Sequence, residues 1–197
     1  PILFSSISVC GQELYVFTEP ASNMPAKSVF VKTAARFSAT SQRYDRFTQR
    51  YTPEVMLGIS KKLMVHVGGT FSNMHKAKLT GESIFLYGKY RFLSVDDVHS
   101  HFRMATFINA SKSFVPFHNE DVSLMGDKTG IEAGVIATQL WYKFALSGTV
   151  SHAQLLDESR YNKVIYVPSR IYKAMSYSLS AGYLLFPREY KNYKQLN

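Results

Sequence analysis

Few side chains in this 197-residue chain have the types and spacing that could support chemistry. His99, His101 and Arg103 are each two residues apart, so a β-strand would place all three on one face. Two imidazoles on one face can bind a metal, but such a site needs a third ligand and supporting partners. The neighbouring sequence offers none, so we expect an interior-lining group and no metal site.

Nucleophilic catalysis would need a serine, a base and an orienting group in register. Ser147 or Ser176 could approach His101, but serines are frequent throughout the same part of the chain. The chain holds one cysteine, Cys10, close to its first residue. We therefore expect no catalytic residues, no cofactor and no enzymatic activity.

A basic set offers a different kind of site. The candidate residues for the lining of an interior are Lys89, Arg91, His101, Arg103 and Glu132. If Lys89, Arg91 and Arg103, with His101 beside them, face water in a channel, they would favour anionic solutes by electrostatic focusing. The alternative, which we favour, is that Glu132, Glu54 and Asp96 neutralise them within a packed interior.

The elements that would position these residues are β-strands, because apolar and polar residues alternate along most of the chain. We expect eight strands, in an all-β, antiparallel, up-and-down arrangement. They cover residues 28–39, 51–60, 63–72, 81–92, 99–110, 130–139, 142–151 and 171–186. Lys32 and Arg36 illustrate the pattern, since a helix would scatter them and a strand places them on one face.

The connections alternate between short and long, as in transmembrane β-barrels. Turns at 60–62, 96–97 and 140–142 are short, whereas 40–50, 73–80, 111–128 and 152–170 are long. The strands are also longer than the usual five or six residues of soluble sheets. The aromatic residues beside the short turns suit an interfacial girdle; they are Phe92, Phe102, Trp141 and Phe186.

Alternation alone does not tell which face is inside, so a soluble lipocalin-like barrel remains the alternative. No stretch approaches the 18 or so consecutive apolar residues of a membrane-spanning helix. The formal charge is +9, but the basic residues are scattered and no nucleic-acid-binding motif is present. We therefore expect no nucleic-acid partner.

The first residues resemble the end of a signal peptide. We expect residues 1–11 to be its remnant, residues 12–27 to be a periplasmic segment and residues 28–197 to form the barrel. Lipidation at Cys10 is an alternative, although Val9 is a poor match to the usual preceding residue. A periplasmic start at Gln12 would place the short turns in the periplasm and the long loops outside.

Three segments resemble uncharacterised outer-membrane β-barrel proteins of the Bacteroidota, which are transporter-like and distantly similar to phenol-degradation outer-membrane barrels. The segments are residues 13–25, 98–105 and 187–190. The resemblance implies a Gram-negative outer-membrane location and a β-barrel fold. It implies contact with outer-membrane lipid, lipopolysaccharide and the barrel-assembly machinery, and assigns no substrate.

Barrels of this kind usually finish on a strand with a terminal aromatic residue, whereas this chain ends at Asn197. We therefore expect a fragment of a barrel of about 10–12 strands, with a complete eight-stranded barrel as the alternative. The expected function is porin-like passive transport of small solutes, or a structural role. An outer-membrane enzyme, a loop-mediated binding protein and a soluble binder are the alternatives.

Overall fold

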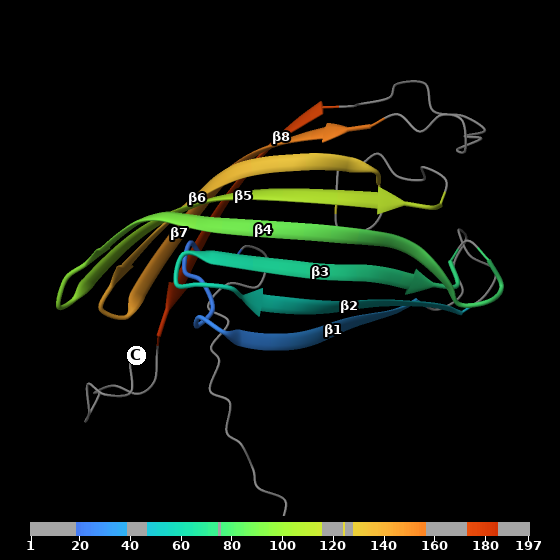
Figure 1. Ribbon diagram of the computed structural model, residues 1–197, viewed down its shortest axis with the longest axis horizontal. Helices are drawn as coiled ribbons and strands as arrows, with labels where there is room; N and C mark the ends of the chain where they lie inside the picture. The colour runs from blue at the N-terminus through green and yellow to red at the C-terminus, as the bar shows by residue number, and fades with distance from the viewer. Residues whose placement is uncertain are drawn as a thin grey trace, which may run out of the picture.

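The computed structural model describes residues 19–38, 47–74, 76–115, 124, 128–156 and 173–184. These residues form eight strands and no helix: β1 (Ser28–Ser38), β2 (Thr48–Gly58), β3 (Leu63–Ser72), β4 (Thr80–Asp96), β5 (Ser100–Ser113), β6 (Gly130–Trp141), β7 (Phe144–Leu155) and β8 (Lys173–Tyr183). Each strand pairs antiparallel with the next in the chain. The result is one up-and-down sheet, strongly curved, with β1 and β8 at its two edges (Figure 1).

All eight predicted strands are present, but the end predicted for the fourth is wrong. The prediction ends it at Phe92, where two consecutive apolar residues interrupt the alternation, whereas β4 continues to Asp96. The register with β5 shifts between Arg91 and Leu93, which is a β-bulge. A bulge absorbs one extra residue in a strand, so the alternation resumes beyond it. β5 and β7 likewise extend into segments predicted as loops, to Ser113 and Leu155. β2 begins at Thr48, within a predicted loop, and ends at Gly58, two residues before its predicted end.

The turn predicted at residues 140–142 lies one or two residues later, between Trp141 and Phe144. Tyr142 there has a φ of 47°, in the left-handed region that side-chain-bearing residues seldom adopt. Its amide donates a hydrogen bond to the carbonyl of His99 in the β4–β5 turn, and the two rings stack. These two short turns therefore lie against each other at one end of the sheet.

The two faces of the sheet differ in polarity. The outward, convex face is apolar and exposed; away from the two edge strands it includes Val55, Val67, Ile84, Leu86, Ile108, Ile131, Val135 and Val150. The concave face is mostly buried and carries polar or charged residues such as Glu54, His66, Lys89, Asn109, Thr138 and Ser147. The predicted division of every strand into an apolar and a more polar face is thus observed.

Within the described residues the sheet stays open, because no pairing joins β1 to β8. The predicted antiparallel up-and-down sheet is present, and its closure into a barrel remains a prediction. The segment Glu19–Lys27 enters the concave side at the end of the short turns, where the Lys27 amide donates to the carbonyl of Gly58 (Figure 1).

No helix in the part of the chain that the structure describes is long and apolar enough to cross a membrane. The predicted signal-peptide remnant at residues 1–11, with Cys10, lies outside the described residues. So do Phe186 of the predicted aromatic girdle and residues 187–190 of the resemblance.

Candidate functional site in the concave face

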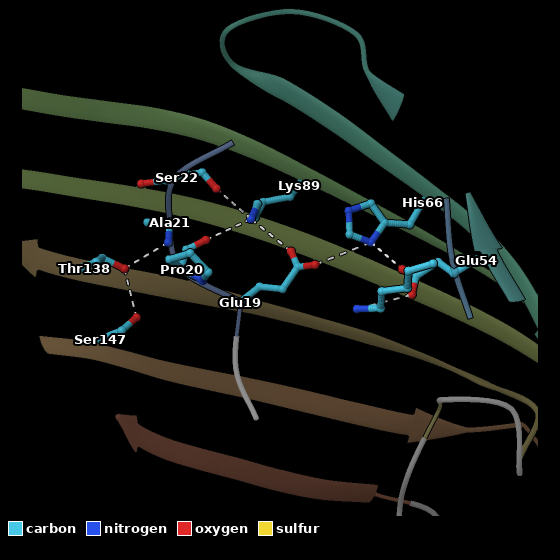
Figure 2. A network of polar contacts seen from close by, with 10 residues as sticks. Glu19, Pro20, Ala21, Ser22, Glu54, His66, Lys89, Thr138 and Ser147 are labelled. Carbon is cyan, nitrogen blue, oxygen red and sulfur yellow. Dashed lines mark hydrogen bonds and ion pairs between the residues drawn. The ribbon is translucent and has the colours of Figure 1, made fainter. Parts of the chain in front are cut away.

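The concave face holds the start of the described chain. Glu19, Pro20, Ala21 and Ser22 precede β1 and lie across the inner sides of β3–β6 (Figure 2). Prolines at positions 20 and 25 disfavour a central strand here, so the backbone groups of this stretch are free to bond with side chains. We call residues 19–23 the inner segment.

Lys89 of β4 binds the inner segment through its side chain. Its ammonium donates to the carboxylate of Glu19 at 3.0 Å, to the carbonyl of Pro20 at 2.8 Å and to the carbonyl of Ser22 at 3.0 Å. An ammonium group has three donors, so these acceptors saturate it. Lys89 is only 1% exposed. A buried charge is tolerated when it is paired and hydrogen-bonded, and the inner segment supplies every one of these partners.

An ion-pair chain continues from Glu19 toward the edge of the sheet. The second carboxylate oxygen of Glu19 lies 3.5 Å from Nδ1 of His66, and Glu54 lies 2.7 Å from the same nitrogen. Glu54 also lies 3.7 Å from the ammonium of Lys32. Acidic and basic groups thus alternate across β1, β2, β3, the inner segment and β4 (Figure 2). Nε2 of His66 is buried and has no hydrogen-bond partner among the described residues.

Ala21 anchors the segment on its other side. Its amide donates to the hydroxyl of Thr138 at 2.9 Å, and that hydroxyl lies 2.9 Å from the hydroxyl of Ser147. Ala21 is fully buried and packs in a small apolar cluster with Ala105, Phe107 and Ile136. The inner segment is therefore fixed by both polar and apolar contacts, from β3 to β6.

A second polar group lies nearer the short turns. Arg103 donates to the hydroxyl of Ser22 at 2.9 Å and to the carboxylate of Asp96 at 3.1 Å, and His101 lies 2.8 Å from that carboxylate. Partial burial raises the pKa of Asp96, but hydrogen bonds from His101, Arg103 and Ser94 outweigh it and hold the pKa below its ordinary value. Asp96 is 48% exposed, at the β4–β5 turn.

The five residues predicted to line an interior all lie on strands of the concave face, but they do not form one cluster. Lys89 binds the inner segment, whereas His101 and Arg103 share Asp96. Glu132 accepts a hydrogen bond from Ser151 at 2.6 Å, and no basic residue in the described part of the chain forms an ion pair with it. Nε of Arg91 is buried and lacks a hydrogen-bond partner among the described residues.

The expected neutralisation is thus present for Asp96, with a different acid at Lys89. Sequence reasoning missed Glu19, because its contact with Lys89 joins residues 70 positions apart and neither lies in a recognisable motif. One signal was available: an inward-facing lysine in mid-strand needs a partner, and Glu19 is the acid next to the strand region on its N-terminal side.

The far end of the concave face is also covered in part. Leu124, from the connection between β5 and β6, is buried against Ala153 and Leu155 of β7. Among the described residues no group of three or more His, Cys, Asp or Glu side chains is arranged to hold a metal ion.

Comparison with known proteins gives no further guide. No family model matches the chain, and neither the curated proteins nor the solved structures include a significant match. The two faces of the sheet and the contacts of the inner segment are therefore the features of this chain that bear on its function.

Proposed function

We propose that this chain forms the wall of an outer-membrane β-barrel with a passive role in the passage of small solutes. The observation that carries the proposal is the polarity of the sheet. Its convex face exposes large apolar side chains across strands β2–β7, while its concave face buries lysine, histidine and glutamate. Transmembrane barrels have this arrangement, with an apolar band outward and a polar interior.

A soluble β-barrel is the alternative that this polarity disfavours, because such a barrel packs its apolar face inside. Aromatic and aliphatic residues such as Phe71, Ile84, Leu86 and Ile108 are about half exposed. More than ten such side chains expose an area on the order of 1,000 Å², above the few hundred Å² of apolar patch on a typical soluble monomer. The hydrocarbon core of a membrane is the environment that best accommodates an exposed apolar face of this size.

Hydrocarbon also constrains the edges of the sheet. Unpaired backbone groups cost several kcal/mol each in lipid, so the outer edges of β1 and β8 must pair, with each other or with further strands. The outward residues of both edge strands are apolar as well, among them Val29, Val31, Met175, Tyr177 and Leu179. This pattern supports continuation of the apolar band around a closed barrel.

The proposed orientation places the short turns in the periplasm and the long connections outside, as is usual for such barrels. The exposed Trp141 and Phe144 stack on each other beside the β6–β7 turn, where an interfacial girdle would lie. In this setting the partners of the outer face are outer-membrane lipid and lipopolysaccharide, and insertion requires the barrel-assembly machinery.

A passive role fits the concave face better than catalysis. Its charged groups are largely engaged in pairs with one another, through Glu19, Glu54 and Asp96. The inner segment occupies part of the space at the periplasmic end. We therefore propose a narrow conduit or an occluded barrel and not a wide pore.

Refolding into phospholipid vesicles tests the proposal. The expected results are co-flotation with the vesicles, migration on a gel that changes on heating, and quenching of Trp141 fluorescence by lipids brominated near the headgroup. Trp141 is the one tryptophan of the chain, so the signal has a single source. A protein that stays monomeric and folded in buffer without detergent, and whose Trp141 is not quenched by any brominated lipid, would contradict it.

A further inference from the structure

We infer that Lys89 and His66 form a binding site for the carboxylate group of a small solute, which the chain's own Glu19 occupies in this structure. The inference rests on the proposed function, because it places the site inside a solute-conducting barrel. It adds to that function the chemical class of the ligand and the element that competes with it.

The geometry around Glu19 is that of a bound carboxylate. One oxygen lies 3.0 Å from the ammonium of Lys89, and the other lies 3.5 Å from Nδ1 of His66. The ammonium of Lys89 thus donates to one oxygen of a planar anion, and the imidazole of His66 lies beside the other oxygen while its Nδ1 is engaged by Glu54. A carboxylate fits this spacing, since it presents one oxygen to each of the two side chains.

The site is built into the sheet and does not depend on flexible side chains at a surface. Lys89 and His66 are 1% and 2% exposed, and the ring of Tyr87 is tilted against that of His66 and stacked on that of Phe107. His66 is further held by Glu54 at 2.7 Å. The His66 ring therefore stays in place if the Glu19 side chain leaves, and the ammonium of Lys89 keeps its bonds to the carbonyls of Pro20 and Ser22.

Glu19 is the part of this arrangement that can be exchanged. Its side chain is 33% exposed, unlike those of Lys89 and His66. It lies in the inner segment, outside the sheet, so its removal breaks no strand pairing. Without Glu19 the ammonium of Lys89 would lack its anionic partner at a buried position, a costly state that a solute carboxylate would relieve. Solute and Glu19 therefore compete for one site, and binding of the solute removes one of the contacts that hold the inner segment, so the segment opens more often.

Cysteine reactivity measures this release. Ser147 is buried beside Thr138, which binds the inner segment, so Ser147→Cys in a Cys10→Ser background reports uncovering of that region. Ser151 lies on the same strand and the same face, beside Glu132, and Ser151→Cys is therefore the matched control. The protein is refolded in vesicles, and its reaction with N-ethylmaleimide is followed by mass spectrometry in sodium acetate or in sodium chloride of equal ionic strength.

We expect acetate to accelerate modification at position 147 and not at position 151. Glu19→Gln should raise the rate at position 147 roughly tenfold in chloride, because a charge-assisted hydrogen bond becomes a neutral one. Lys89→Met should raise that rate as well and abolish its dependence on acetate. This combination would support a carboxylate site at Lys89.

Other outcomes overturn the inference. Equal acceleration at both positions would mean general loosening of the sheet, and equal effects of phosphate and acetate would mean that any anion suffices. A rate at position 147 that acetate leaves unchanged would also overturn it. Flotation and heat-dependent migration of the same samples test the proposed function separately, so a correctly inserted barrel without an acetate effect refutes the carboxylate site alone.

Discussion

Replacing Lys89 with methionine should detach the inner segment while leaving the sheet folded. The substitution keeps an unbranched side chain of similar length and removes three hydrogen bonds, at 2.8–3.0 Å, that all go to residues 19–22. Strand pairing is unaffected because the bonds lost are made by the side chain. The effect should therefore be local, at the contact between the inner segment and β4.

The free energy lost in Lys89→Met can be estimated from the burial and the pairing of the ammonium. Hydrogen bonds that involve a charged group each contribute about 1.5–3 kcal/mol net, but part of this gain offsets the cost of burying the ammonium. Breaking a buried ion pair typically costs about 3–5 kcal/mol. Glu19 is partly exposed and can regain water, so we expect docking of the inner segment to weaken by the lower end of that range, about 3 kcal/mol. At 1.4 kcal/mol per factor of ten, this corresponds to a roughly 100-fold change in the docking equilibrium.

Hydrogen exchange at the Ala21 amide is the assay. That amide is fully buried and bonded to Thr138, so it exchanges only when the inner segment opens. In Lys89→Met its exchange should be about 100-fold faster, with amides in the middle of β5 and β6 unchanged. Lys61→Met, at an exposed position in the β2–β3 turn, is the control. Unchanged exchange at Ala21 would refute the argument that Lys89 holds the segment.

Two further predictions concern packing and pH. Gly134→Ala should lower the free energy of unfolding in vesicles by about 1–3 kcal/mol, because a Cβ there would lie 2.6–2.7 Å from atoms of Val150, Phe107 and Ser151. Gly88→Ala is the control and should be tolerated, since the nearest atom to its Cβ would lie at 3.9 Å. Urea titration compares the two variants, and equal unfolding midpoints would contradict the packing around Gly134. Asp96 has a lowered pKa in the folded state, so its contribution to stability is present above its unfolded pKa of about 4 and is lost as the pH falls through the folded value. Because Asp96 is about half exposed, Asp96→Asn should lower the free energy of unfolding by less than about 1 kcal/mol at pH 7. Urea titration at several pH values should show this difference shrinking on acidification, and a difference that stays constant would contradict the prediction.

The sequence predicted the strands well because alternation is a local property. Each strand reports its two faces through its own residues, as β3 does over Leu63–Ser72, where the predicted and observed bounds agree. The extension of β4 beyond Phe92 escaped prediction because a β-bulge depends on the partner strand, which local alternation does not describe.

The candidate site was predicted only in part, for a similar reason. Inward-facing positions such as Lys89 and Arg103 follow from alternation, whereas their partners do not. The contact of Lys89 with Glu19 and that of Arg103 with Ser22 each join residues far apart in the sequence. Only the curvature of the sheet, which brings β3–β6 around the inner segment, places these groups together (Figure 1).

The central claim is that the convex face lies against lipid and the concave face does not. Spin labels at Val150→Cys and Thr149→Cys, in a Cys10→Ser background, test it most directly, since the two residues are adjacent on β7 and lie on opposite faces. In vesicles, the label at position 150 should be relaxed mainly by oxygen, which concentrates in hydrocarbon. The label at position 149 should be shielded from lipid-dissolved oxygen by comparison. Equal accessibility of both positions to a water-soluble nickel complex, with no excess of oxygen at position 150, would contradict the account.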